Sequence, residues 1–167
     1  INLWKEIYIG IREANNVIAK VPAIDMDENL RNRIVGEAKF LRALHYFNLV
    51  RGFGEVPLRT MPVESGEDEG LPLSSIVDIY DVIIDDLTYA SENCWARNES
   101  GLELGRATNT AAHALLAKVY TRMASCKRTA EQGNEGNSLY LALPESYQTY
   151  YQYAKDQCDA ALNGSGY

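Results

Sequence analysis

The stretch that decides the fold of this chain is GEAKFLRALHYFNLVRGFGEVPL, which spans Gly36–Leu58. At about 100° per residue, the apolar side chains of its helical part point in almost every direction. Counted with Ile34 and Val35, which directly precede the stretch, they are Ala38, Phe40, Leu41, Ala43, Leu44, Tyr46, Phe47, Leu49 and Val50. A helix that is apolar on nearly all sides must be covered by neighbours on several of them. The stretch therefore predicts an inner helix around which the other helices pack.

The same stretch contains the signal that ends this helix. Gly52 and Gly54 loosen the backbone, and Pro57 pushes Val56 out of the helical region. We therefore expect the helix to end near Arg51. The two glycines lack the third glycine and the preceding strand of a dinucleotide-binding fingerprint, so they predict a turn.

Two helices are expected to form an antiparallel hairpin over residues 2–51. The first begins at an Asn2 cap, buries one apolar face and ends at Pro22. A cap at Asp25 or Asp27 begins the second helix. Because only a short turn separates them, the two helices should be neighbours.

Three further helices are expected after this hairpin. Ser74 or Ser75 should cap the third helix, Thr108 the fourth, and Asn163 with Gly164 should end the fifth in a left-handed cap. The expected segments are a loop over 52–73, a helix over 74–94, a loop over 95–107, a helix over 108–125, an irregular span over 127–144 and a helix over 145–163.

Five helices without a convincing strand predict one all-α domain over residues 1–167. Helix hairpins of roughly 34 residues are typical of tetratricopeptide-like pairs. Trp4, Ile7, Tyr8 and Gly10 match part of the first helix of that repeat. Stacked hairpins bury a continuous core and leave curved outer surfaces for partners.

The composition excludes several classes of function. The chain has 167 residues and a mean hydropathy of −0.28, which are typical of a globular domain with a full core. No window offers about 18 consecutive apolar residues, so no membrane-spanning segment is expected. Sixteen basic and 23 acidic side chains give a net charge of −7, which works against binding to nucleic acid.

The histidines and cysteines form no pattern typical of catalysis, of a metal site or of a cofactor site. His45 and His113 lie among apolar helix residues, so each is expected to be packed or hydrogen-bonded. Cys94, Cys126 and Cys158 are odd in number and include no C-x-x-C pair, so neither a disulfide framework nor a zinc site is indicated.

The carboxylates are expected to be structural or solvated. Asp78, Asp81 and Asp85 share one helix face, which could attract a hard cation but is interpreted as a solvated face. Asp85 and Asp86 are sequential and point about 100° apart, so they do not form an acid/base pair. A glycosidase would require two carboxylates that face one cleft. The expected helix faces bring no two carboxylates together in that way.

Four segments, taken in order and spacing, carry a family resemblance. They are IREANNVI at Ile11–Ile18, EAKFLRALHYFNLV at Glu37–Val50 with GFGEVPL at Gly52–Leu58, YDVIIDDLTYA at Tyr80–Ala90, and GRATNTAAHALLAKVY at Gly105–Tyr120. The chain resembles the SusD/RagB family, the surface glycan-binding lipoproteins of Bacteroidetes-type outer membranes.

The resemblance implies a non-catalytic protein that binds oligosaccharides without a cofactor and works in nutrient uptake. It also implies a location on the outer-membrane surface and partnership with a SusC-like TonB-dependent transporter. The chain is expected to be a fragment of a longer protein. Membrane attachment would come only through a lipid anchor that lies outside this chain. The alternative left open is a tetratricopeptide-type scaffold that binds a peptide or protein partner.

Glycan binding requires flat aromatic rings beside polar side chains, because sugars stack their apolar faces and hydrogen-bond their hydroxyls. Most tyrosines at helical spacing are expected on core faces, namely Tyr80, Tyr120, Tyr147 and Tyr151. Trp95, followed by Arg97 and Asn98, heads a polar loop as a sugar platform would, so these three are the candidate ligand contacts. Arg106, in the G-R pattern of the family, is expected to pair with an acid of the scaffold.

Overall fold

The structure, a computed structural model, describes residues 2–62 and 70–164. It contains five α-helices and two 3₁₀ helices: α1 (Asn2–Lys20), η1 (Val21–Ala23), α2 (Glu28–Phe53), α3 (Ile76–Asn93), α4 (Asn109–Glu131), η2 (Glu135–Ala142) and α5 (Tyr147–Gly164). Within these described ranges there is no strand, and one isolated antiparallel bridge joins Val56 to Ser74. The predicted all-α fold is confirmed.

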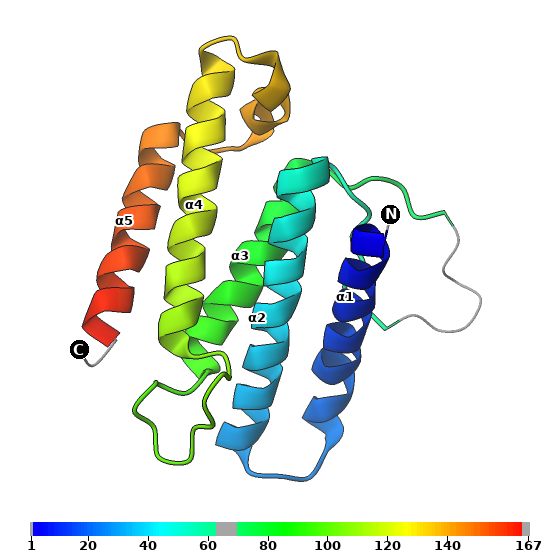
Figure 1. The fold of residues 1–167 in the computed structure, drawn as a ribbon, viewed down its shortest axis with the longest axis vertical. Helices are drawn as coiled ribbons and strands as arrows, with labels where there is room; N and C mark the ends of the chain where they lie inside the picture. Colours follow the sequence, from blue (N-terminus) through cyan, green and yellow to red (C-terminus); the bar gives the residue numbers. More distant parts are fainter. Residues whose placement is uncertain (1, 63–69, 165–167) are drawn as a thin grey trace.

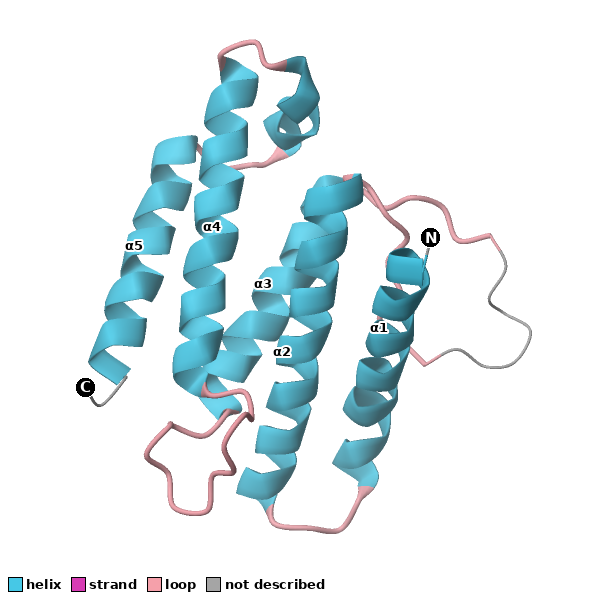
Figure 2. Ribbon diagram, in the orientation of Figure 1, coloured by secondary structure: helices cyan, strands magenta, loops and turns pink. Residues whose placement is uncertain are grey.

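The five α-helices lie in a row, and each runs antiparallel to the next (Figure 1). Helix α2 packs between α1 and α3, while α4 packs between α3 and α5. The connections gather at the two ends of the helices, and part of the α2–α3 connection passes along α1 (Figure 2). The predicted hairpin and the inner position of α2 are thus confirmed.

The ends of α2 show which sequence signals were effective. The Asp27 side chain accepts a hydrogen bond from the backbone N–H of Leu30 at 2.9 Å, so the predicted cap is confirmed. The predicted end at Arg51 is wrong by two residues, because Gly52 stays helical. The terminator is Gly54, whose φ of +74° lies in the region that favours glycine.

Helix α2 is not covered on every side. Its buried positions include Val35, Ala43, Phe47 and Leu49, but Leu41 is 49% exposed. The expectation that apolar residues are buried around the whole helix is therefore wrong at Leu41. Helices α1 and α3 cover two sides of α2, and Leu41 lies on a side that they leave open.

Two predicted helix ends at the C-terminal half are also wrong. Helix α4 continues to Glu131, six residues beyond its predicted end, because Cys126, Lys127 and Ala130 extend its buried face. Most of the remaining span, which was expected to be irregular, forms η2. Helix α5 includes Asn163 and Gly164, so they do not form the expected cap.

At the other helix starts, the predicted caps Ser75 and Thr108 are confirmed by hydrogen bonds from Asp78 N at 3.2 Å and Ala111 N at 3.2 Å. Asn2 is the first residue of α1. The first helix ends at Lys20, and Pro22 lies within the turn η1 that follows, as predicted.

The core runs through the row of helices and includes Ile11, Tyr46, Ile83, Leu116 and Tyr150. Tyr80 is fully buried, as predicted.

The prediction for the tyrosines of α5 is wrong at Tyr151, which is exposed, whereas Tyr147 is half-buried as expected. The buried residues of α5 include Tyr150 and Ala154. Tyr150 stacks on the half-buried Tyr120 of α4, with ring centroids 6.4 Å apart. None of the described helices combines the length and apolar character needed to cross a bilayer.

Candidate functional site

Trp95 begins the loop that joins α3 to α4, and contacts with other residues hold its ring in place. The guanidinium carbon of Arg33 lies 4.0 Å from the centroid of the indole, which is a cation–π contact. The backbone carbonyl of Trp95 accepts a hydrogen bond from Asn109 N at 3.3 Å, which closes the loop. The indole is half-buried, and Arg33 leaves at most one of its faces to a ligand.

Ion pairs hold Arg33 beneath the tryptophan. Arg33 Nε donates to Glu37 Oε1 at 2.9 Å, and Arg106 Nε donates to the same oxygen at 2.9 Å. Arg106 Nη1 also donates to Glu103 Oε2 at 2.9 Å. The prediction that Arg106 pairs with an acid of the scaffold is confirmed, and the pair ties the end of the loop to α2.

These contacts control the charge of Glu37. Burial opposes its ionisation, but hydrogen bonds from Arg106 and Arg33 outweigh burial and hold the pKa of this carboxyl below its usual value. Glu37 therefore stays ionised at neutral pH and keeps both cations in position.

Trp95 lines a polar hollow of about 540 Å³ between the start of α2, the end of α3 and the loop. This volume lies in the range of small-molecule sites, about 300–1,000 Å³. The other polar lining residues include Asn29, Asn32, Glu92, Glu99 and Asn109. Amide and carboxylate groups beside an indole supply the donors, the acceptors and the apolar surface that a sugar needs.

Of the three candidate contacts, the structure brings only Trp95 to this hollow. Arg97 and Asn98 are exposed in the loop and lie outside its lining. Sequence reasoning missed Asn29 and Asn32, although their i, i+3 spacing at the start of a helix places them on one face. No pattern in the sequence predicts that the start of α2 lies beside the loop that follows α3.

Cys94 also lines the hollow, but it does not supply a reactive nucleophile. Burial, reinforced by the negative charge of Glu37, raises the pKa of this thiol to about 12 against the opposing charge of Arg33. The thiol is therefore protonated at neutral pH, and the thiolate is the nucleophilic form.

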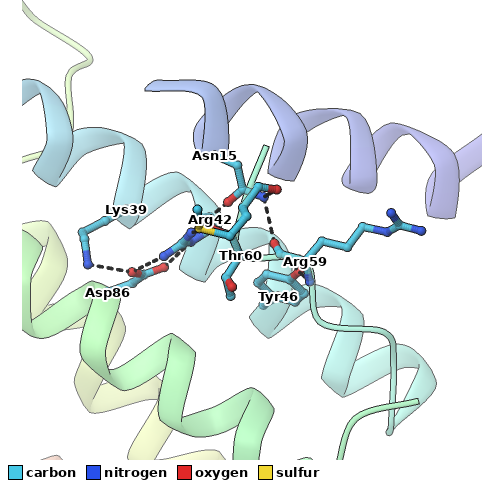
Figure 3. A network of polar contacts seen from close by, with 8 residues as sticks. Asn15, Lys39, Arg42, Tyr46, Arg59, Thr60 and Asp86 are labelled. Atoms are coloured by element: carbon cyan, nitrogen blue, oxygen red, sulfur yellow. Dashed lines mark hydrogen bonds and ion pairs between the residues drawn. The ribbon is translucent and has the colours of Figure 1, made fainter. Parts of the chain in front are cut away.

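A buried polar network lies between α1, α2 and α3, with Arg42 at its centre (Figure 3). Arg42 donates to both carboxylate oxygens of Asp86, at 2.7 and 2.8 Å, and Lys39 Nζ donates to the same carboxylate at 3.1 Å. Arg42 Nη1 also donates to Asn15 Oδ1 at 2.8 Å and to the Thr60 carbonyl at 3.0 Å.

The same network holds the segment after α2 against the helices. Asn15 Nδ2 donates to the Arg59 carbonyl at 2.8 Å, and the Arg59 backbone N–H donates to the Tyr46 hydroxyl at 2.7 Å. With Arg42 and Asp86 buried, this network is a structural clamp and not a ligand site. Sequence reasoning missed it, although Asp86 occupies a position on the apolar face of its helix.

The histidines and the acidic face behave as predicted. His45 packs over Gly10, where a Cβ would lie 2.3 Å from its Nε2, and burial lowers the pKa of His45. His113 Nδ1 lies 2.7 Å from Gln157 Oε1, within hydrogen-bond distance. Asp78, Asp81 and Asp85 are all exposed, as the interpretation as a solvated face requires.

Comparisons with known proteins agree with the fold. A family model described as "Starch-binding associating with outer membrane" matches residues 1–121. A SusD-like protein of Bacteroides ovatus is 31% identical over 159 residues, covering 93% of this chain and 27% of that protein. SusD-like protein P2 of Formosa agariphila is 33% identical over 130 residues, covering 77% of this chain and 25% of that protein.

Solved structures give the same answer. A laminarin binding SusD-like protein is 38% identical, with a TM-score of 0.68 over 77% of this chain and 28% of that one. A structure with xylogluco-oligosaccharide is 27% identical, with a TM-score of 0.77 over 98% of this chain and 29% of that one. The chain spans about a quarter of the length of the curated relatives it matches. The family match and the shared helical fold together show that this chain belongs to the SusD-like family.

Proposed function

We propose that this chain serves in non-catalytic glycan binding and nutrient uptake at the outer-membrane surface, together with a SusC-like TonB-dependent transporter. The observation that carries the proposal is the 38% identity to a laminarin binding SusD-like protein. The structure with xylogluco-oligosaccharide supports the same ligand class. Relatives described as binding proteins support reversible capture without catalysis.

The polar hollow at Trp95 is the proposed glycan contact within this chain. The open part of the indole would stack on the apolar face of a sugar ring, while Asn32 and Glu99 would hydrogen-bond its hydroxyls. The Arg33 stack supports this role, because a ring held in place before binding loses little freedom when a ligand arrives. Arg97 and Asn98, exposed on the same loop, are the proposed outer contacts.

The test is calorimetric titration of the whole protein with laminarin and xyloglucan oligosaccharides. We expect one of them to bind saturably, and Trp95→Ala and Asn32→Ala each to weaken binding by about tenfold or more. Tyr151→Ala, which removes an exposed ring on α5, is the matched control and should bind like the wild type. Thermal melting of each variant separates lost contacts from lost folding.

Each other result points elsewhere. Saturable binding that both variants leave unchanged would remove the Trp95 hollow from the proposal and place the site outside it. Absence of binding to any sugar would favour the alternative of a tetratricopeptide-type scaffold for a peptide partner. Co-purification with a TonB-dependent transporter, and cleavage by protease added to intact cells, test the proposed partner and location.

A further inference from the structure

A second hollow, of about 340 Å³, lies between α1 and the segment that follows α2. Its volume is at the lower end of ligand sites, which start at about 300 Å³. Its lining includes Trp4, Tyr8 and Pro57 together with three cationic residues, Lys5, Arg12 and Arg59. On α1, Trp4, Tyr8 and Arg12 follow one another at intervals of four residues, and Lys5 lies seven residues before Arg12. These side chains therefore share one face of the helix.

The apolar wall of this hollow is fixed by packing. The Trp4 ring lies 5.1 Å from Tyr8 and 4.9 Å from Phe53, the latter edge to face. The Tyr8 hydroxyl donates to the Pro57 carbonyl at 2.8 Å, which ties the two walls together. The aromatic surface is therefore built before any ligand binds.

The charge of this hollow is opposite to that of the protein. The chain carries a net charge of −7, yet three cationic residues line the hollow, and the residues of its lining that the structure describes include no carboxylate. Arg59 faces Tyr8: burial raises the pKa of the Tyr8 hydroxyl and Tyr46 adds to this, while the positive charge of Arg59 opposes them.

Lys5 and Arg12 are exposed at the same hollow. Arg12 pairs with Glu13 at 2.7 Å, but its side chain is 55% exposed. An exposed pair of this kind is weak, so an anionic ligand can displace Glu13.

We infer that this hollow is a second saccharide subsite, specific for a sugar unit that bears a carboxylate or sulfate group. The inference rests on the proposed glycan function. Trp4 would stack on the sugar ring, and Lys5, Arg12 and Arg59 would surround its anionic group. The hollow at Trp95 is lined by Asp27, Glu92 and Glu99, which repel such a unit, so the two hollows divide neutral from anionic sugars.

The test compares charged and neutral forms of the same sugar by calorimetry on the whole protein. The probes are tetragalacturonate with its methyl ester, and a sulfated carrageenan tetrasaccharide with its desulfated form. We expect one charged probe to bind at least tenfold more tightly than its neutral form, and the two pairs show which anionic group is preferred. Lys5→Gln and Arg12→Gln should each weaken that binding about three- to tenfold, and the exposed Lys118→Gln on α4 should not.

Three results would overturn the inference even where a charged probe binds. They are equal binding of the charged and neutral forms, binding that ignores Lys5→Gln and Arg12→Gln, and competition by hexaglutamate at equal affinity, which would assign the hollow to an acidic peptide. Binding of neutral laminarin oligosaccharides that depends on Trp95, without any binding of the charged probes, would overturn this inference alone. Absence of binding to any sugar would overturn the proposed function with it.

Discussion

Arg42 of α2 and Asp86 of α3 form a two-point ion pair, with Nε 2.7 Å from Oδ2 and Nη2 2.8 Å from Oδ1. Their side chains are only 7% and 2% exposed. The third nitrogen of the guanidinium, Nη1, donates to Asn15 Oδ1 of α1 and to the Thr60 carbonyl. Arg42 therefore joins α1, α2, α3 and the segment that follows α2. The pair thereby holds the segment after α2, whose residues Pro57 and Arg59 line the second hollow together with α1.

Asp86→Asn is expected to lower the free energy of unfolding by about 3–5 kcal/mol, because it leaves Arg42 buried without a counter-charge. Chemical denaturation of the whole protein measures the loss. Asp85→Asn changes the exposed neighbouring carboxylate and should stay within about 0.5 kcal/mol of the wild type. An Asp86→Asn protein as stable as the Asp85→Asn protein would show that the clamp contributes little.

Gly52 and Gly54, two residues apart, are expected to respond to alanine with opposite signs. Gly52 is helical, with nothing within 4 Å of a built Cβ, so Gly52→Ala should stabilise by up to about 1 kcal/mol. Gly54 has a φ of +74°, and an added Cβ would lie 3.2 Å from Leu139 Cδ1. Gly54→Ala should therefore destabilise by about 1–2 kcal/mol.

Thermal and denaturant unfolding of the two glycine variants measures both signs in one experiment, and each variant serves as the control for the other. Equal effects of the two substitutions would contradict the assignment of Gly54 as the residue that ends α2.

Local signals in the sequence were sufficient to predict most of the fold. Helical periodicity predicted five helices, and the side chains of Asp27, Ser75 and Thr108 cap them because each needs only its own next turn. The end of α4 could not be predicted this way. Its last turns are held by contacts with distant residues, such as the hydrogen bond from Lys127 Nζ to the Leu143 carbonyl.

The candidate site was predictable only in part, for the same reason. Trp95 was singled out by its place at the head of a polar loop, and the structure puts it at a hollow. The stack of Arg33 on its ring joins residues from two helices, and no local pattern predicts that contact. The spacing of Trp4, Tyr8 and Arg12 was visible in the sequence, but their hollow depends on Pro57.

The last prediction concerns pH and the Glu37 carboxyl. Because its folded-state pKa lies below its unfolded value of about 4.3, the folded state binds fewer protons in this range. The stabilisation from its pairs with Arg33 and Arg106 is therefore fully present above about pH 5. It is lost as the pH falls through the folded-state pKa. Glu37→Gln, which cannot ionise, should be less stable than the wild type at pH 7, and the difference should shrink below about pH 4.

Urea denaturation at pH 7 and at a series of lower pH values measures this difference between the wild type and Glu37→Gln. Glu103→Gln is the matched control, because that carboxylate also pairs with Arg106 but its side chain is 73% exposed. Its effect should be small at every pH, since an exposed pair contributes little. A stability difference for Glu37→Gln that stays constant across the pH series would show that its side chain acts by packing and not by charge. Anchoring of the Trp95 loop would then depend on the shape of Glu37, and acid alone would not release it.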